Sequence, residues 1–390
     1  MGTMNQDLLY QKVEALADSV FPVCEYLSAH PEVGGEEKLA SSYITEFLAK
    51  RGYDIELDYA GLQYAFKASK PSDKPRVAVM CEYDALPEIG NGCGHSLSCA
   101  ISILAALAVD DACEDFPFTI DLIGTPGEET IGGKVVIAEN GGFDGYQFAI
   151  MGHVDSINAP QYNALACNDM YITFEGEASH ASATPWKGKS ALNAAQLFMH
   201  GVDLNKTYYK PFMQMHGIMR EGGVSPGIIP DKSVLEYFPR AATMSELKEL
   251  NNQSRLMAEG VAHATGTSVR IEQRYPTFAD MHDGPTANRV ITELFEELGE
   301  TVEPIKYPNG SSDVGNVDLV IPGFQLEIKG TDTPIPFHTV EFERLTHGER
   351  AMKTLKMGAK VIAAFIARTA YDDGLMKQII DDWKKYRTEN

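Results

Sequence analysis

The chain has 390 residues, of which 44% are hydrophobic and 23% are charged, and its formal net charge is -22. This length exceeds one ordinary hydrophobic core, so two domains are expected. The acidity argues against nucleic-acid binding, because a phosphate-binding surface needs a basic field. The sequence has no uninterrupted apolar run of about 18 residues, so no membrane-spanning segment is expected.

The six cysteines are irregularly spaced in a long chain, which is not the pattern of a disulfide framework. They are Cys24, Cys81, Cys93, Cys99, Cys113 and Cys167. The N-terminal segment lacks the basic start and apolar core of a secretion signal. These two features predict reduced thiols and a cytoplasmic location.

The first part of the chain alternates helix and strand signals. Segments with helical spacing and short apolar runs follow one another, and each apolar run ends in a polar or glycine-rich turn. The segments cover 6–30, 36–51, 76–80, 96–108, 118–123 and 148–151. Short apolar runs of this kind are typical of buried strands in a largely parallel sheet. The alternation predicts an α/β layered domain.

From about residue 169 the pattern changes to the order βαββαβ, which is the ferredoxin-like arrangement with an antiparallel sheet. The expected elements are 170–175, 190–203, 213–219, 233–241, 244–266 and 268–275. We therefore expect an inserted domain over 169–284, within a first domain formed by 1–168 and 285–390. After the insertion, helices are expected at 285–298 and 346–369 and strands at 317–321 and 324–328.

Residues with metal-binding side chains follow three of the apolar runs. They are Cys93, His95, Glu128, Glu129 and His153. In open α/β sheets, sites form at the carboxyl ends of the strands, so these side chains are expected to meet. A thiolate, imidazoles and a carboxylate suit a borderline-soft divalent ion, zinc above all. One of two adjacent glutamates can bind the ion while the other activates water, which predicts a metal-dependent hydrolase.

Each of these residues taken alone has a structural alternative. Cys93 and His95 could be a buried thiol beside a helix-capping histidine. The two glutamates could be a solvated surface pair, and His153 could be a loop histidine with its hydrogen bonds satisfied. The coincidence of three placements at one edge of a sheet favours the metal site.

Three further residues have settings that suggest a role near this site. His338 lies in a stiff, proline-bracketed segment that would fix a ligand well, although it could equally be a surface residue. His180 lies in the expected insertion, where a hydrogen-bond donor to a substrate carbonyl oxygen is a better fit than a ligand. Asp84 could orient a ligand histidine or be an ordinary turn aspartate.

Several segments between about residues 80 and 340 resemble, in the right order, the clan MH metallopeptidases and amidohydrolases that include aminoacylase-1 and carboxypeptidase G2. The segments are CEYDALPEIGNGCGHSLSCA, GTPGEETIGGKVVIAENGGFD, MGHVD, GEASHASATPWKGKSALNA, GIIPD, SSDVGNV and FHT. The resemblance is closest to the branch of aminobenzoyl-glutamate hydrolase, the plant auxin-amino-acid conjugate hydrolases and certain mammalian dipeptidases.

The resemblance implies a catalytic domain with an inserted lid or dimerisation domain, and two divalent ions per subunit, zinc or else manganese or cobalt. It implies the ligands Cys93, His95, Glu129, His153 and His338, with the cysteine bridging the two ions. Glu128 would be the general base. His180 would polarise the scissile carbonyl across the interface of a homodimer.

The implied reaction is hydrolysis of an amide bond in a small N-acyl amino acid or a dipeptide. Arg240, at the end of a strand of the insertion, could bind the substrate carboxylate or make a surface ion pair. Gly227 stands where the family often has an asparagine.

Two other hypotheses are a non-catalytic metal- or ligand-binding module, which would lack the base, and a hydrolase in which Cys93 is the nucleophile. The adjacent glutamates disfavour a thiolate.

Overall fold

The computed structural model describes residues 5–112, 115–303, 307–308 and 310–389, so Cys113 lies outside the described residues. The chain divides into two compact units. The larger unit comprises Met1–Asn163, Met281–Tyr307 and Ser312–Glu389, and the smaller comprises Ala164–Asp280 and Pro308–Ser311. The sequence-based boundaries were 169 and 284. The role of the smaller unit as a lid or dimerisation domain stays a prediction.

The larger unit is built on a six-stranded sheet with the order β1-β2-β4-β3-β5-β13. Its strands are β1 (Asp54–Leu57), β2 (Phe66–Ser69), β3 (Arg76–Cys81), β4 (Thr119–Gly124), β5 (Tyr146–Asp155) and β13 (Gly323–Lys329). The last four are mutually parallel, whereas β1 and β2 are antiparallel at one edge. The prediction of a mixed, largely parallel sheet is therefore confirmed.

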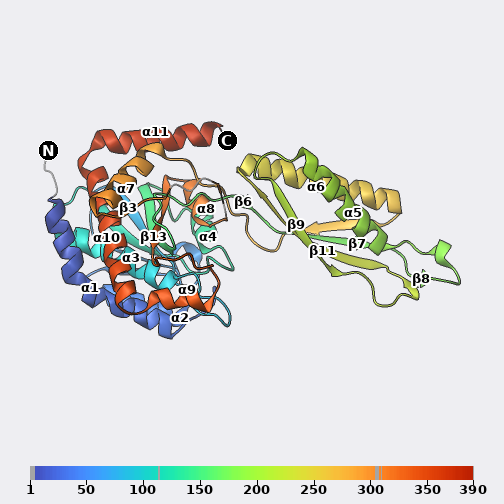
Figure 1. Ribbon diagram of the computed structural model, residues 1–390, viewed down its shortest axis with the longest axis horizontal. Helices are drawn as coiled ribbons and strands as arrows, with labels where there is room; N and C mark the ends of the chain where they lie inside the picture. Colours follow the sequence, from blue (N-terminus) through green and yellow to red (C-terminus); the bar gives the residue numbers. More distant parts are fainter. Residues whose placement is uncertain (1–4, 113–114, 304–306, 309, 390) are drawn as a thin grey trace. The chain divides into compact units, whose positions relative to one another are not determined.

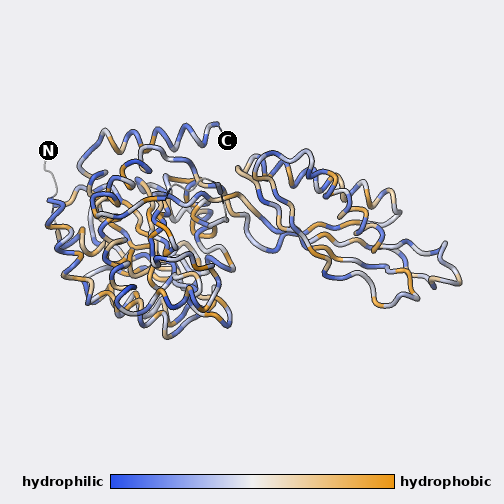
Figure 2. The backbone as a smooth tube through the Cα atoms, viewed as in Figure 1, coloured by the Kyte–Doolittle hydropathy of each residue, from blue (hydrophilic) through white to orange (hydrophobic). Residues whose placement is uncertain are grey.

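Helices surround this sheet (Figure 1). They are α1 (Gln6–Ala29), α2 (Lys38–Ala49), α3 (His95–Ala112), α4 (Gly133–Glu139), α7 (Pro285–Glu297), α8 (Val314–Asp318), α9 (Val340–Glu343), α10 (Gly348–Tyr371) and α11 (Asp373–Glu389). By length and composition alone α3 could cross a membrane, but 83% of it is buried inside the fold. The central strands are largely hydrophobic and α11 is mostly hydrophilic (Figure 2).

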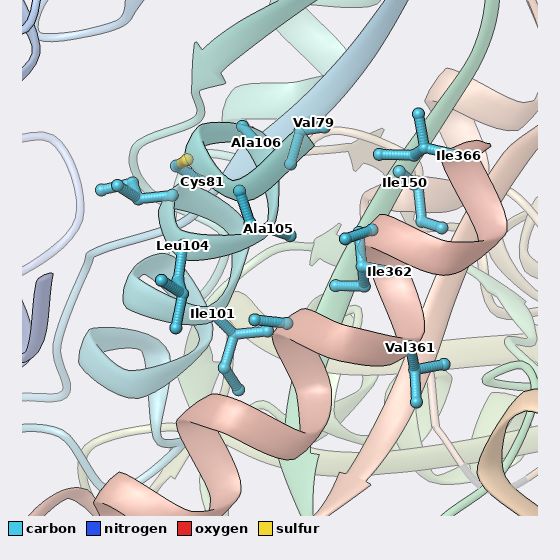
Figure 3. Packing of buried hydrophobic residues seen from close by; sticks show 14 of the residues in the cluster. Val79, Cys81, Ile101, Leu104, Ala105, Ala106, Ile150, Val361, Ile362 and Ile366 are labelled. Carbon is cyan, nitrogen blue, oxygen red and sulfur yellow. The ribbon is translucent and has the colours of Figure 1, made fainter. Parts of the chain in front are cut away.

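The core beside β5 is tight because two glycines let α3 and α10 approach the sheet. A Cβ atom on Gly152 would lie 3.1 Å from Ile362 and 3.4 Å from Ile101, and one on Gly358 would lie 3.0 Å from Ile101. Ile101 of α3 and Ile362 of α10 face each other across this contact (Figure 3). Close packing of this kind resists displacement of the strand, which also carries His153.

The smaller unit has a five-stranded sheet, in which β12-β7-β11-β6 form the main path and β9 pairs with β11. The elements are β6 (Ala166–Cys167), β7 (Met170–Glu175), α5 (Ala191–Asn205), β9 (Gln214–Glu221), β11 (Lys232–Ala241), α6 (Met244–Thr265) and β12 (Ser268–Glu272). All pairings are antiparallel. Buried alternate residues of β7 and β11 pack against α5 and α6. This is the predicted βαββαβ arrangement.

One predicted element is wrong. The sequence suggested a strand at 317–321, but the chain forms the short helix α8 there, and the next strand begins only at Gly323. Val314 and Val317 of α8 are both buried, three residues apart on one helical face. A short apolar run does not distinguish a strand from one turn of helix.

Phe148 of β5 supports the strand that carries His153, through edge-to-face contacts with Phe118, Phe324 and Phe365. We predict that Phe148→Ala lowers the free energy of unfolding by about 3–5 kcal/mol, because it leaves a cavity where a fully buried ring stood. Urea denaturation followed by circular dichroism measures the change. The control Leu57→Ala, at a side chain 62% exposed on β1, should change stability by less than about 0.5 kcal/mol. Equal effects of the two substitutions would contradict this account of the core.

Candidate metal centre

The carboxyl ends of the four parallel strands bring the predicted residues together. Asp84 lies just after β3, Glu128 and Glu129 follow β4, and Glu327 of β13 pairs in register with His153 of β5. His153 therefore lies inside β5, whereas the sequence suggested that it lies in a loop after the strand. The strand is longer than the apolar run because the polar residues at its end still pair with β13.

One group of ligand atoms comes from Cys93, His95 and Glu129, whose side-chain atoms all lie within 4.8 Å of one another. Cys93 Sγ is 2.5 Å from Glu129 Oε1. Gly94 has a φ of 78°, a left-handed conformation that suits glycine, and this turn lets both side chains face the same point before α3 begins at His95. Three of the five predicted ligands thus converge within one small space.

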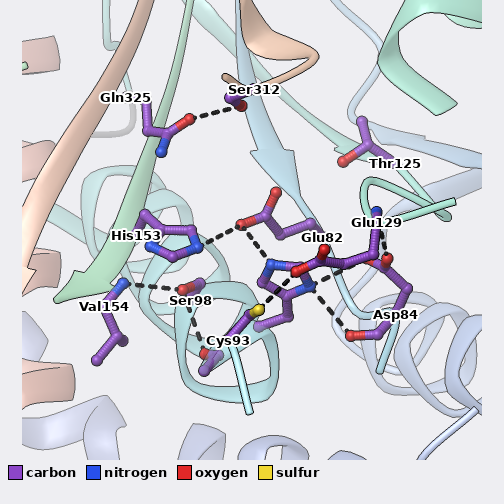
Figure 4. A network of polar contacts seen from close by, with 12 residues as sticks. Glu82, Asp84, Cys93, Ser98, Thr125, Glu129, His153, Val154, Ser312 and Gln325 are labelled. Carbon is purple, nitrogen blue, oxygen red and sulfur yellow. Dashed lines mark hydrogen bonds and ion pairs between the residues drawn. The ribbon is translucent and has the colours of Figure 1, made fainter. Parts of the chain in front are cut away.

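A second group comes from Glu82, His95 and His153, again within 4.8 Å. Glu82 Oε1 lies 3.6 Å from His95 Nε2 and 3.7 Å from His153 Nε2. Figure 4 shows Glu82 between His153 and the residues around Cys93. The two groups share His95, so they lie side by side. Glu82 was not predicted as a ligand, although it lies two residues after the predicted strand at 76–80.

The orientation of His95 leaves one ring nitrogen for an ion. Its Nδ1 lies 3.0 Å from both the carbonyl and the carboxylate oxygen of Asp84, and two acceptors require the proton to be on Nδ1. The Nε2 lone pair then points to the ligand groups. The other carboxylate oxygen of Asp84 accepts the backbone N–H of Glu129 at 2.9 Å. Asp84 therefore holds two of the candidate ligands at once.

His338 reaches this region from a distant part of the chain. Its Nε2 lies 3.5 Å from Glu129 Oε1, and its backbone N–H donates to the carbonyl of Gly92 at 3.0 Å. The φ of His338 is 62°, which is unusual for a residue with a side chain. Strained backbone of this kind persists where the surroundings hold it, often at functional sites.

The electrostatics of the group fit a divalent cation. Burial and the nearby Glu129 and Glu128 raise the pKa of the Cys93 thiol. Burial together with Asp313 and Glu129 raises the pKa of Glu128 well above its usual range, although Lys134 opposes this. Both shifts favour the protonated forms of Cys93 and Glu128 when no cation balances the surrounding acids. A divalent ion would displace those protons, and the thiol, imidazole and carboxylate donors suit one.

Lys134, at the start of α4, is a buried cation of this region that was not predicted from the sequence. Its Nζ donates to Glu82 Oε2 at 2.9 Å and to Asp313 Oδ1 at 2.7 Å. Asp313 belongs to the SSDVGNV segment and also accepts the backbone N–H of Lys134. Glu82, Lys134 and Asp313 each lie in a segment that resembles the family, and this was the one sequence feature that could have indicated them. They are too far apart along the chain for their spacing to suggest contact.

Two predicted residues lie in the smaller unit. His180 is exposed on β8 (Ser179–His180), and its Nδ1 accepts the backbone N–H groups of Ser182 and Ala183 at 3.3 and 3.2 Å. The ring proton therefore lies on Nε2, which is left as a donor. Arg240 of β11 donates to Ser311 Oγ at 2.8 Å and lies over the Phe238 ring.

We predict that Asp84→Asn weakens zinc binding about 10- to 100-fold, the usual effect of losing the partner that orients a ligand histidine. Isothermal titration of the metal-free protein measures it. Asp332→Asn is the control, because Asp332 pairs with Arg350 on the surface of the same unit and should leave the affinity unchanged. Unchanged affinity in Asp84→Asn would show that the contact with His95 does not serve the metal.

Comparison with known proteins agrees with this geometry. The family model for peptidase family M20/M25/M40 matches residues 78–368. The chain is 31% identical to the Xaa-Arg dipeptidase of Mus musculus over 379 residues, covering 92% of this chain and 85% of the relative. It is 28% identical to one of the subunits of the p-aminobenzoyl-glutamate hydrolase of Escherichia coli, covering 66% of this chain and 58% of the relative.

The fold also matches a solved structure, a dinuclear metal-binding peptidase of Bacillus subtilis. The TM-score is 0.68 at 19% identity, and the match covers 91% of this chain and 99% of that protein. The matched family segment contains every candidate ligand and the adjacent Glu128. The chain belongs to peptidase family M20/M25/M40 and is a metal-dependent hydrolase of amide bonds.

Proposed function

We propose that this enzyme cleaves dipeptides and small N-acyl amino acids at a centre of two divalent ions, zinc or else manganese or cobalt. The observation that carries the proposal is the pair of adjoining ligand groups that share His95, with Glu128 next to the ligand Glu129. Cys93, His95, Glu129, His153 and His338 would hold the ions. When bound, such ions acidify water and polarise a carbonyl oxygen.

Glu128 would handle the proton in this reaction. It accepts a proton from the attacking water and delivers it to the departing amine. Its pKa is raised by burial and by the surrounding acids, which favours a group that carries a proton between the two steps. A carboxylate that binds an ion directly would serve this purpose less well, which separates the role of Glu128 from that of Glu129.

His180 would stabilise the negative charge that develops on the substrate carbonyl oxygen. Its Nδ1 accepts two backbone N–H groups, so its Nε2–H is a fixed donor. The family resemblance leads us to place His180 across the interface of a homodimer formed through the smaller unit. In that assembly one subunit would complete the centre of its partner.

The substrate would carry a free carboxylate, and Arg240 would bind it. Among the residues that the structure describes, Arg240 donates to Ser311 and forms no ion pair, so its charge is available. Dipeptides that end in arginine or lysine are our first choice of substrate. The name of the Mus musculus relative points to them, and the net charge of -22 attracts cations.

We also propose that the enzyme acts in the cytoplasm. Cys24, Cys81, Cys93 and Cys99 are free and buried, as expected for a protein kept reduced. The hypothesis of a Cys93 nucleophile is disfavoured because burial and two neighbouring glutamates raise the thiol pKa. The hypothesis of a non-catalytic module gains no support, since Glu128 is present beside the ligands.

We predict that Glu128→Gln lowers kcat by about 10²- to 10⁴-fold, because the amide cannot take the proton from the attacking water. The metal content, measured by atomic emission, should stay at the wild-type level. The adjacent substitution Glu129→Gln is the matched comparison and should reduce the metal content. Full turnover in Glu128→Gln would exclude this carboxylate as the base.

We predict that the metal-loaded enzyme releases free amino acids from dipeptides ending in arginine or lysine faster than from aminobenzoyl-glutamate or N-acetyl amino acids. Amino acid release is measured with zinc, manganese, cobalt or a chelator added. Chelation should abolish the activity and added metal should restore it. Activity that survives the chelator but is lost on thiol alkylation would favour the Cys93 nucleophile instead.

A further inference from the structure

A buried charge cluster beneath the metal centre contains more negative than positive charge. Glu82, Lys134 and Asp313 are each at most 1% exposed. The Lys134 ammonium lies 2.9 Å from one oxygen of Glu82 and 2.7 Å from one oxygen of Asp313. When both carboxyl groups are ionised, one ammonium faces two carboxylates, which leaves one negative charge to be balanced by another cation. Buried charge without such compensation is costly.

The two carboxylates differ in what their second oxygen contacts. The second oxygen of Asp313 accepts the backbone N–H of Lys134 at 2.9 Å. The second oxygen of Glu82, Oε1, is buried and has no hydrogen-bond partner among the described residues. It instead lies 3.6 and 3.7 Å from the Nε2 atoms of His95 and His153. The unbalanced charge is therefore located on the side of Glu82 that faces the histidines.

Both histidines present the ring nitrogen that a metal would use. The proton of His95 is fixed on Nδ1 by Asp84, and His153 Nδ1 faces Glu327 Oε2 at 3.7 Å. Their Nε2 atoms thus turn away from these carboxylates and towards Glu82. Glu82 Oε1 and the two Nε2 atoms make a compact set of one anionic oxygen and two imidazoles, which is suitable for a divalent ion.

We propose that Glu82 is a sixth metal ligand, beyond the five that the family resemblance implies. Its Oε1 binds an ion together with His95 and His153, while its Oε2 remains on Lys134. Lys134 then acts as a positioning residue that holds the carboxylate at the ion. This inference rests on the metal centre of the proposed function, and it changes the ligand set of that centre.

The test compares Glu82→Gln with Asp313→Asn, which each remove one carboxylate charge from Lys134. In Glu82→Gln the amide oxygen can stay on Lys134, which turns the NH₂ group, a non-ligand, towards the histidines. Zinc affinity and stoichiometry are measured by competition with a chromophoric chelator, and the melting temperature is measured without metal. We expect Glu82→Gln to bind one ion at least about 10- to 100-fold more weakly, whereas Asp313→Asn retains both ions at the wild-type affinity.

Unchanged zinc binding in Glu82→Gln overturns the proposal, and so does an equal loss in both variants, since Glu82 would then act only through Lys134. If Glu82→Gln fails to fold, Glu82→Asp replaces it. That variant keeps the charge but withdraws the oxygen by one methylene, and wild-type affinity in it also overturns the proposal. A wild-type protein that binds no zinc, manganese or cobalt would instead refute the proposed function itself.

Discussion

Compensation of buried negative charge is the constraint on which the larger unit depends. The carboxyl edge of its sheet gathers several carboxylates and a thiol, and the ammonium of Lys134 pairs with two of the carboxylates. Burial raises the pKa of Glu327 to about 7, although His153 opposes this shift. Burial also acts to raise the pKa of Glu82, but Lys134, His95 and His153 outweigh it and lower that pKa to about 2. The folded site therefore favours cations. A ligand that binds only the folded state stabilises that state, so metal binding and folding are linked here.

The scaffold that holds these charges is rigid where precision is needed. The parallel strands end together, and α3 and α10 pack closely on β5 because Gly152 and Gly358 leave room for Ile101 and Ile362. His153 is thereby held by a strand and His95 by the first turn of a helix. Ligands carried by such elements keep their geometry without metal, which reduces the cost of ordering the site when an ion binds.

The sequence predicted the features that depend on local pattern. The βαββαβ order of the smaller unit and the placement of Cys93, His95 and the two glutamates after strands follow from short-range periodicity and strand ends. The pairing of Glu82 with Lys134 could not be predicted, because 52 positions separate the two residues and only the fold brings them together. The helix α8 was mistaken for a strand since tertiary packing, not periodicity, decides the form of so short an apolar run.

The position of His338 in the chain determines when the set of candidate ligands is complete during synthesis. Cys93, His95, Glu129 and His153 all precede the smaller unit in the chain, whereas β13 and His338 follow it. When synthesis has reached residue 280, the nascent chain contains the four candidate ligands that precede the smaller unit. It still lacks β13, which pairs with β5, and His338, whose backbone N–H donates to the carbonyl of Gly92. The complete ligand set thus exists only after the whole insertion has been made. Binding of ions by this full set would therefore require that both halves of the interrupted unit have joined.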